Sequence, residues 1–397
     1  MNAEDEARLG FSTRAVGGWR RVDDVGQSPL SPPIYQVATF GFGDMDDFAS
    51  VAKSKISGGY LYTRWGNPTV DALARMVSSL EGAEGTACFS SGMAAIHGTL
   101  SALLNSGDHV VASTQLYGGT HGLLSSLFPR YGVETSKVAV GDHEQITAAF
   151  TDRTKILYCE TLGNPTLDVA DLEALSSIAR ARGALLVVDA TFTPPCVLRP
   201  LEHGADIVIH SATKYLGGHF DLTAGVVSGS ARYVDAIRML SLDTGGVLAP
   251  FEAWLTLRGI QTLALRFDAI SANAAGLARM LEGHSNVERV LYPGLPSHRD
   301  HDLARALLGD RFGGMLSFDV AGGVEAGRRV MERARIASAA ASLGGSSTLM
   351  VHPASVTHTQ LNEDQQRASG ITPGMVRVSV GIEDLDDLLA DFDEALR

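Results

Sequence analysis

Four side chains able to supply acid, hydroxyl and amine chemistry lie within one short stretch of the chain. Asp189 follows a short apolar run, and Ser211, Thr213 and Lys214 follow a second one. Runs of this length rich in Val and Ile are typical of buried strands, although periodicity alone does not exclude helix. Ligands of open α/β sheets bind at the carboxyl ends of strands. We therefore expect an acid, two hydroxyls and an amine to converge on one crevice.

This combination suits pyridoxal phosphate, which binds covalently to a lysine amine and needs an acid beside its pyridine nitrogen. Lys214 would be the amine and Asp189 the acid, while Ser211 and Thr213 would bind the phosphate. Each residue alone has a plainer explanation, with Lys214 a solvated surface lysine and Asp189 a helix or turn cap. Their occurrence together, followed by a Gly-Gly pair, favours the cofactor site.

The segment from Ser211 to His219, Ser-Ala-Thr-Lys-Tyr-Leu-Gly-Gly-His, resembles the cofactor-lysine signature of the Cys/Met-metabolism family of pyridoxal-phosphate enzymes. That family includes cystathionine γ-synthase, cystathionine γ- and β-lyases, methionine γ-lyase and O-acylhomoserine sulfhydrylases. The resemblance extends from about Gly10 to the C-terminus. It implies an α/β fold of the aspartate aminotransferase type (fold type I), with a mostly parallel sheet in the cofactor domain.

A chain of 397 residues exceeds the usual size of one domain, so we expect two. The resemblance implies an N-terminal arm at 1–62 that contacts a neighbouring subunit, a large cofactor domain at 63–264 and a small α/β domain at 265–397. The first segment is rich in Gly, Pro and Ser and has little periodicity, which fits an arm. The boundary near 264 falls within a long helical pattern from about 251 to 281.

Charge and composition argue against several classes of protein. The net charge of −13, without a basic cluster, argues against nucleic acid or an anionic membrane as the partner. The acidic first residues lack the regions of a signal peptide, and no run of about 18 apolar residues predicts a membrane span. The three cysteines, Cys88, Cys159 and Cys196, form no disulfide framework or metal pair, which suits a reducing cytoplasm. We expect a cytoplasmic protein.

The elements that must position the chemistry alternate between strand and helix patterns, as in βαβ units. Helices are predicted at 70–80 and 172–182. Strands are predicted at 109–114, 155–160, 184–188, 207–209, 287–291, 316–320, 337–343 and 376–380.

Two further segments match the family's phosphate contacts. Tyr62 and Arg64 belong to a Tyr-x-Arg-x-x-Asn-Pro-Thr pattern, which implies that they reach the cofactor phosphate of a neighbouring subunit, with Tyr62 also near the substrate. The resemblance thus implies a homo-oligomer with shared sites, a tetramer built of dimers. The backbone amides of Gly92 and Met93 would bind the phosphate at a helix N-terminus. Without the resemblance, these segments are a surface loop and an ordinary helix cap.

Three residues complete the implied cofactor contacts. Tyr117 would stack on the cofactor ring and pass a proton to or from the leaving group, and Asn164 would bond the ring oxygen. Thr191, two residues after Asp189, belongs with them. Taken alone, Tyr117 is a packed loop aromatic and Asn164 a turn residue before proline.

The substrate argument depends on two residues near the C-terminus. An amino-acid carboxylate is bound best by the planar fork of an arginine. Arg377 matches the family's carboxylate arginine and Ser342 matches a residue of the same clamp. Without the resemblance, Arg377 is a polar position on a half-exposed strand. His298 and His301 lie among acids, but the stretch resembles an ordinary loop of the family, and we expect no metal.

In the implied reaction Lys214 exchanges with the substrate amine and then moves the Cα and Cβ protons, after which the γ-substituent leaves. The leading hypothesis is γ-elimination on methionine or cystathionine, giving 2-oxobutanoate, ammonia and a thiol. The alternative is γ-replacement on an activated homoserine by a synthase of the same family. A remote alternative from another class is a non-catalytic α/β nucleotide-binding protein.

Four positions depart from patterns common in the family. Ala341 stands where cystathionine enzymes often have a glutamate, and Gly119 where methionine γ-lyases typically have a cysteine. Leu242 replaces a lysine that those lyases tend to carry, and Ala190 replaces an asparagine after the pyridine acid. These changes leave the cofactor residues intact and bear on substrate specificity.

Overall fold

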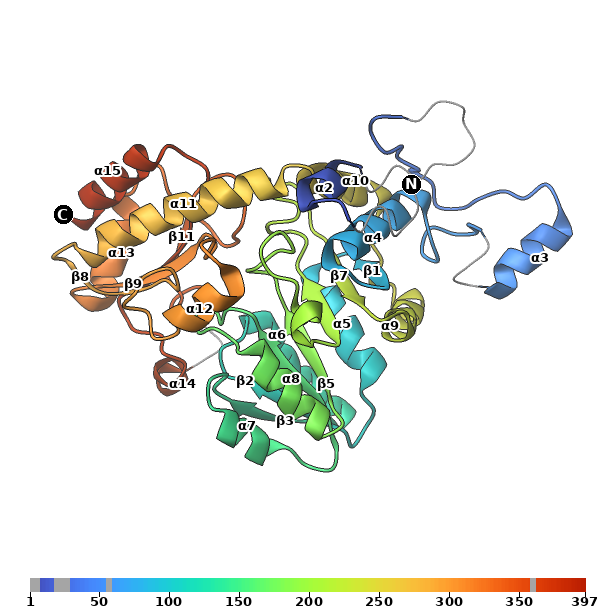
Figure 1. Ribbon diagram of the computed structural model, residues 1–397, viewed down its shortest axis with the longest axis horizontal. Helices are drawn as coiled ribbons and strands as arrows, with labels where there is room; N and C mark the ends of the chain where they lie inside the picture. The colour runs from blue at the N-terminus through green and yellow to red at the C-terminus, as the bar shows by residue number, and fades with distance from the viewer. Residues whose placement is uncertain (1–7, 18–28, 55–58, 358–361) are drawn as a thin grey trace.

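Two β-sheets organise the chain in the computed structural model, which describes residues 8–17, 29–54, 59–357 and 362–397 (Figure 1). The strands of the first sheet are β1 (Gly85–Phe89), β2 (His109–Ser113), β3 (Glu134–Val138), β4 (Thr154–Glu160), β5 (Leu185–Asp189), β6 (Ile207–His210) and β7 (Gly225–Gly229). They lie in the order β1-β7-β6-β5-β4-β2-β3. β7 runs antiparallel to β1 and β6, and β6, β5, β4, β2 and β3 are mutually parallel. The carboxyl ends of β4, β5 and β6 therefore meet at one edge.

Helices cover both faces of this sheet, which explains why its central strands β4, β5 and β6 are largely apolar and buried. In β5, Leu186 and Val188 contribute to one buried cluster and Val187 to the other. The first cluster includes residues of α4 (Pro68–Glu81) and α8 (Leu172–Ala181), and the second those of α5 (Gly92–Leu103) and α9 (Ala231–Thr244). The remaining helices here are α6 (Gly118–Gly122), α7 (His143–Ala149) and α10 (Pro250–Ile260), with the turns η1 (Leu123–Leu127), η2 (Phe128–Tyr131) and η3 (Pro200–His203).

Local signals fix the ends of the helices that frame the site. The side chain of Asn67 accepts the Thr69 amide at the start of α4, Pro68 occupies its first turn, and Gly82 ends it in the left-handed region at φ 70°. Ser91 caps α5 in the same way by accepting the amide of Ala94 at 3.1 Å. The N-terminus of α5 is thereby held at the carboxyl edge of the first sheet.

The second sheet is smaller and lies beside the first (Figure 1). Its strands are β8 (Val287–Leu291), β9 (Met315–Val320), β10 (Ser338–Ala339), β11 (Leu349–Val351) and β12 (Met375–Ser379), in the order β10-β11-β12-β9-β8. The helices packed around it are α11 (Leu263–Glu282), α13 (Gly323–Arg333) and α15 (Leu385–Leu396), and the chain also forms α12 (His301–Leu308) and α14 (Glu363–Ala368). Arg377 and Ser317 are register partners on β12 and β9. Both bond to the loop after β4, which joins the two sheets at the site.

The N-terminal segment includes two helices, α2 (Phe11–Gly17) and α3 (Met45–Ser54). α2 packs on α4 and α11, whereas α3 stands away from the body of the chain (Figure 1). The predicted arm at 1–62 also includes residues 1–7, 18–28 and 55–58, which lie outside the described residues. The division of the chain at 62 and 264 stays a prediction.

Two predictions about elements are wrong. The long helix expected from 251 to 281 is two helices, α10 and α11, because the buried guanidinium of Arg266 bonds the carbonyl of Gly259 at 2.7 Å and competes with helical hydrogen bonding there. The strand expected at 337–343 is limited to β10. Ser342 adopts a φ of 135°, which an extended strand does not allow, and the chain turns into the cavity at this point.

Within the described residues, no helix combines the length and apolarity needed to cross a bilayer.

Candidate active site

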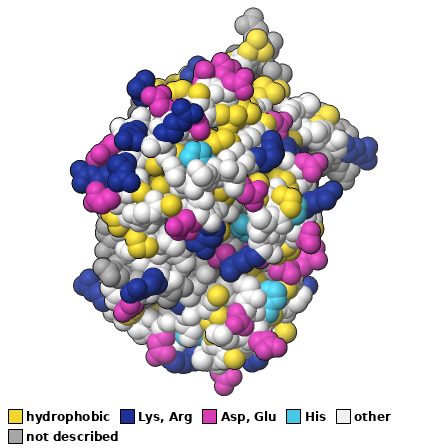
Figure 2. All heavy atoms as spheres, turned by 90° about the vertical axis from the view of Figure 1, so that its left-hand side faces the viewer, with side chains coloured by type: hydrophobic (Ala, Val, Ile, Leu, Met, Phe, Trp, Pro, Cys, Tyr) yellow, Lys and Arg dark blue, Asp and Glu magenta, His cyan; other side chains and the backbone are white. Residues whose placement is uncertain are grey.

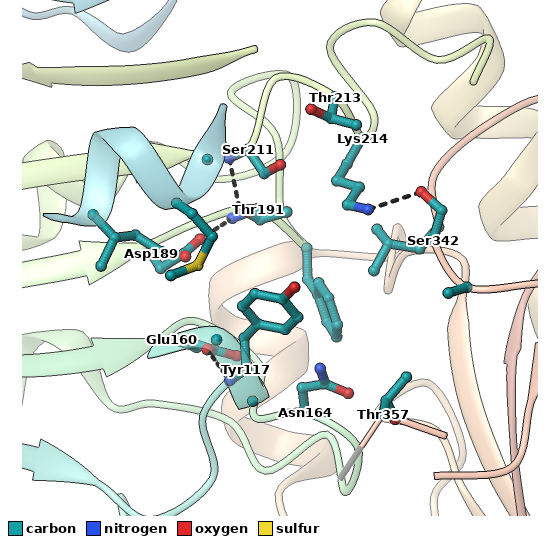
Figure 3. Close-up of a pocket in the computed structure, with 18 of the residues that line it drawn as sticks. Tyr117, Glu160, Asn164, Asp189, Thr191, Ser211, Thr213, Lys214, Ser342 and Thr357 are labelled. Carbon is teal, nitrogen blue, oxygen red and sulfur yellow. Dashed lines mark hydrogen bonds between the residues drawn. The ribbon is translucent and has the colours of Figure 1, made fainter. Parts of the chain in front are cut away.

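A cavity of about 740 Å³ lies where the carboxyl ends of β4, β5 and β6 face the segment between β10 and β11 (Figure 3). Most of the predicted site residues line it: Gly92, Met93, Tyr117, Asn164, Asp189, Thr191, Ser211, Thr213, Lys214, Ser342 and Arg377. They come from both sheets and are far apart in the sequence. The fold therefore brings these side chains together at the carboxyl ends of the parallel strands, where open α/β sheets bind their ligands.

Asp189 is the last residue of β5 and is buried, with 7% of its surface exposed. Its Oδ1 accepts the backbone amide of Thr191 at 2.9 Å, and the hydroxyl of Thr191 accepts the amide of Ser211 at 2.9 Å. Burial raises the pKa of Asp189, while its hydrogen bonds from Thr191 act in the opposite direction. A buried carboxyl of this kind is stabilised as an anion once a positively charged N–H group faces it.

Lys214 follows β6, and its Nζ donates a hydrogen bond to Ser342 Oγ at 2.8 Å (Figure 3). Burial, together with the positive charge of Arg377, lowers the pKa of Lys214 to about 8. Roughly one-tenth of the amine is therefore uncharged at pH 7, far more than for an ordinary lysine. An uncharged amine is the form that attacks a carbonyl carbon.

The N-terminus of α5 forms an anion cradle beside Ser211. A Cβ on Gly92 would meet Ser211 Cβ at 2.7 Å, so only glycine leaves this space open. The amides of Ala94 and Ala95 bond to Ser91, whereas those of Gly92 and Met93 have no partner in the described part of the chain. Free amides at a helix start attract a phosphate. This cradle, together with the amine and the acid, fits pyridoxal phosphate.

The hydroxyl of Thr213, unlike that of Ser211, already forms hydrogen bonds within the described chain. Thr213 Oγ1 donates to the carbonyl of Ala224 at 3.2 Å and accepts the amide of the same residue at 2.9 Å. It lines the cavity, but its hydroxyl also links the loop after β6 to the segment before β7.

Arg377 is 4% exposed on β12 and reaches the loop after β4. Its Nη1 donates to Asn164 Oδ1 at 2.9 Å and its Nη2 to the carbonyl of Ser342 at 3.3 Å. The Nε group is buried without a hydrogen-bond partner among the described residues. Burial lowers the pKa of Arg377 to about 10, so the guanidinium stays charged at neutral pH. An incompletely paired buried guanidinium is well suited to a substrate carboxylate.

Glu160 was not predicted as a site residue, yet it lines the cavity at the end of β4. It is the register partner of Asp189 on β5, and its Oε1 accepts the amide of Tyr117 at 2.5 Å. Burial and the neighbouring Asp189 raise the pKa of Glu160 well above its ordinary value. The rule that selected Asp189 would also have selected Glu160, since both carboxyls end parallel strands that are neighbours.

Tyr62 and Arg64 are not part of this cavity. Arg64 Nη1 donates to the carbonyl of Leu242, its guanidinium lies 5.8 Å from the centre of the Tyr62 ring, and Tyr62 is 44% exposed. Tyr117, by contrast, lines the cavity while 46% exposed. The chain's own cavity therefore lacks the tyrosine–arginine pair that the family pattern assigns to the phosphate.

Further lining residues were not predicted as site residues, although Ala341 was noted as a departure from the family pattern. The apolar ones include Leu162, Phe192, Ala341, Leu343 and Val356. They come from four separate segments, so only the folded chain brings them together. No group of three or more potential metal ligands occurs among the described residues.

Comparison with known proteins agrees with this geometry. The model of the family described as Cys/Met metabolism PLP-dependent enzyme matches residues 12–397. L-methionine γ-lyase from Pseudomonas putida is 44% identical over 390 residues, which cover 98% of this chain and 97% of that protein. Cystathionine γ-lyase from Bacillus subtilis is 42% identical over 368 residues, 92% of this chain and 94% of that protein.

One solved structure bears on both fold and cofactor. It is a putative O-acetylhomoserine (thiol)-lyase from Campylobacter jejuni that contains N′-pyridoxyl-lysine-5′-monophosphate. Its TM-score is 0.93 at 32% identity, with 98% of this chain and 100% of that chain covered. The predicted fold class is confirmed.

Proposed function

Because the chain belongs to the Cys/Met-metabolism family of pyridoxal-phosphate-dependent enzymes, we propose that it is a carbon–sulfur lyase that cleaves L-methionine by γ-elimination. The reaction consumes water and releases 2-oxobutanoate, ammonia and methanethiol. The cofactor is pyridoxal phosphate, and family membership removes the alternative of a non-catalytic nucleotide-binding protein.

The observation that carries the choice of methionine is the chemistry of the cavity lining. The ionisable lining side chains are Tyr117, Glu160, Asp189, Lys214 and Arg377. Tyr117, Asp189, Lys214 and Arg377 each have a use at the cofactor, the carboxylate or the reacting atoms, and Glu160 accepts the backbone amide of Tyr117. Beside the clamp lie Ala341, Leu343 and Val356, which are apolar. Among the described lining residues, no further charged group is available to bind the second amino-acid group of cystathionine. The thioether methyl group of methionine, by contrast, suits the apolar surface formed by Ala341, Leu343 and Val356.

The cofactor contacts divide between its two ends. The amides of Gly92 and Met93 and the hydroxyl of Ser211 would hold the phosphate, with Thr213 supporting them, and Asp189 would keep a proton on the pyridine nitrogen. Thr191 orients Asp189 through the 2.9 Å hydrogen bond that its backbone amide donates to Asp189 Oδ1. Asn164 would donate a hydrogen bond from its side-chain amide to the ring oxygen of the cofactor. When bound, pyridoxal phosphate supplies an electron sink for the pair left on Cα after deprotonation.

The chain's own residues bind the substrate and move the protons. Arg377 and Ser342 bind the carboxylate and so fix the Cα–H bond relative to Lys214. Lys214 Nζ takes the Cα proton and moves protons at Cβ, which its lowered pKa of about 8 favours. Tyr117 closes the side of the cavity and gives its hydroxyl proton to the departing sulfur.

A second candidate is γ-replacement on an O-acylhomoserine, favoured by the likeness to the Campylobacter jejuni protein. The same lysine, clamp and acid would serve it, with a nucleophile entering the cavity. The test is release of 2-oxobutanoate from L-methionine, L-cystathionine and O-acetyl-L-homoserine, assayed side by side without added thiol. We expect methionine to be the best substrate. If the enzyme with bound cofactor released no 2-oxobutanoate from methionine or cystathionine, the lyase proposal would be rejected in favour of the synthase.

The assembly we propose is a homo-oligomer in which Tyr62 and Arg64 complete the site of a neighbouring subunit, in a tetramer built of dimers. Their exclusion from the chain's own cavity supports this assignment. Mixing the inactive variants Lys214→Ala and Arg64→Ala would then restore part of the activity, because mixed dimers contain one intact site.

The three free cysteines suit a reducing compartment, and we propose a cytoplasmic location, which cell fractionation tests.

A further inference from the structure

A second cavity, of about 410 Å³, lies behind the active-site loops. Its wall on the first-sheet side includes Gln115 and Thr166, each two residues from a site residue, Tyr117 and Asn164 respectively. The opposite wall comes from β8, the loop before α12, and the end of α14 with the residues after it: Arg289, Val290, Leu291, Ser297, His298, Arg299, Arg367, Ser369 and Gly370. The cavity therefore contacts both halves of the site without sharing a residue with the first cavity.

The charge of this lining is opposite to that of the chain. Three arginines and a single carboxylate, Asp168, line the cavity, in a chain whose net charge is −13. Figure 2 shows the side of the molecule formed by the second sheet and its helices, where acidic and basic side chains are intermixed. Asp300, Asp319 and Asp364 pair with these arginines from outside the lining, so the hollow offers an anion the free N–H donors of the guanidinium groups rather than an unbalanced charge.

Carboxylates engage each of these arginines but leave part of each guanidinium group free. Arg289 bonds Asp319 through Nε at 2.7 Å, which leaves its terminal amino groups without a partner among the described residues. Arg367 bonds the exposed Asp364 through Nη2 at 2.9 Å. Arg299 pairs with Asp168 through Nη2 and with Asp300 through Nε at 3.6 Å. An arginine has five N–H donors, so each retains donors for a ligand.

His298 supplies a donor that has no partner. The side chain is buried, with 6% of the residue exposed, and its Nδ1 accepts the amide of Asp300 at 3.2 Å. The neutral ring therefore carries its proton on Nε2. Burial lowers the pKa of His298, which keeps the ring neutral at pH 7. Nε2 has no hydrogen-bond partner within the described chain, although His298 lines the cavity. This histidine belongs to the Ser-His-Arg-Asp-His-Asp stretch, for which the proposed function has no use.

We propose that this cavity is a binding site for a small divalent oxyanion, held by the guanidinium groups of Arg289, Arg299 and Arg367 and by the Nε2–H of His298. The ligand class is a phosphate monoester or a short dicarboxylate. Both present two charged oxygen groups to arginine forks. Because the wall includes Gln115 and Thr166, a bound anion connects the second sheet to the loops that carry Tyr117 and Asn164.

The test is a binding measurement, so its outcome is separate from that of the lyase assay. Holoenzyme is reduced with borohydride so that the cofactor's own phosphate fills the first cavity. Inorganic phosphate and malonate are then titrated by calorimetry at constant ionic strength. We expect saturable binding of about one anion per chain. Tighter phosphate binding would identify a phosphate ester as the ligand class, and tighter malonate binding a dicarboxylate.

The decisive variant is the double substitution Arg289→Gln and Arg367→Gln, which retains a donor toward Asp319. Its matched control is Arg328→Gln with Arg333→Gln, which removes the same charge from the exposed surface of α13. We expect affinity to fall by about tenfold or more in the first double variant and to stay unchanged in the control. Absence of saturable binding by the unaltered chain, or an equal loss in both double variants, would overturn the proposal.

Discussion

Lys214 Nζ and Ser342 Oγ are joined by a 2.8 Å hydrogen bond that links the loop after β6 to the segment between β10 and β11. Ser342 also offers its carbonyl to Arg377, so one residue contacts both the amine and the carboxylate clamp. It does so at a φ of 135°, a region that L-residues rarely adopt. Strained backbone at a ligand clamp is stabilised by the contacts around it.

This strain predicts that Ser342→Gly is more stable than Ser342→Ala by roughly 1 kcal/mol, because glycine adopts this φ without steric cost and both variants lack the hydroxyl. Urea unfolding of the two variants measures the difference directly. Both should show a raised KM for the amino-acid substrate. An alanine variant as stable as the glycine variant would show that the backbone is not strained here.

The lowered pKa of Lys214 predicts how cofactor capture depends on pH. With a pKa of about 8, roughly one-tenth of the amine is neutral at pH 7 and most of it at pH 9, whereas an ordinary lysine stays almost fully charged at both. The rate at which apoenzyme captures pyridoxal phosphate should therefore rise from pH 7 to about 9 and then level off. Stopped-flow absorbance follows this reaction. A rate that continues to rise above pH 10 would contradict the lowered pKa.

Glu160 predicts a difference between two substitutions at one position. Glu160→Gln keeps a carbonyl acceptor for the Tyr117 amide and resembles the protonated acid, so kcat should stay within about threefold. Glu160→Ala leaves that amide without its partner, at a cost of roughly 1–3 kcal/mol, and should lower kcat by about tenfold or more. Steady-state kinetics on both variants, with circular dichroism to verify folding, checks this. Equal losses would show that the negative charge of Glu160 is what matters.

Gly92 predicts an effect on cofactor affinity alone. In Gly92→Ala the new Cβ would approach Ser211 Cβ to 2.7 Å, which displaces the hydroxyl from the cradle. We expect the affinity for pyridoxal phosphate to fall by about tenfold or more. Gly122→Ala is the matched control, because Gly122 lines the same cavity but its Cβ would meet nothing within 4 Å. Absorbance titration of both apoenzymes gives the comparison, and equal affinities would argue against the cradle.

Burial alone does not decide which strands the sequence predicts: β7 is buried at every residue and is not among the predicted strands, whereas β8 has one buried residue and is. The runs that end at Glu160, Asp189 and His210 are long enough and apolar enough to be recognised, and their order along the chain fixes which residues meet. β3 is mostly exposed or half-exposed, and β11 has only three residues. Neither gives a clear period, and neither was predicted.

The residues of the site also fall into two groups, those that the sequence predicts and those that it does not. Residues within a continuous motif, such as Ser211 to Lys214, are found from the sequence because the motif is local. Val356 and Phe192 line the cavity only because distant segments fold against it. The break between α10 and α11 also depends on a distant partner, since the guanidinium of Arg266 bonds the carbonyl of Tyr215 at 3.0 Å as well as that of Gly259. No period within 251–281 encodes that contact.

That contact gives α11 a mechanical role. The helix has 20 residues and is therefore about 30 Å long, and Arg266 fastens its first turn to Tyr215, the residue directly after Lys214. The first turn of α11 is thus fixed one residue from the reactive amine, and the rest of the helix packs against β8 and β9. A tilt of about 5° at this turn moves the far end by roughly 2.5 Å. A rotation of α11 about this point would thus displace the second sheet, which supplies Arg377, more than it displaces Lys214.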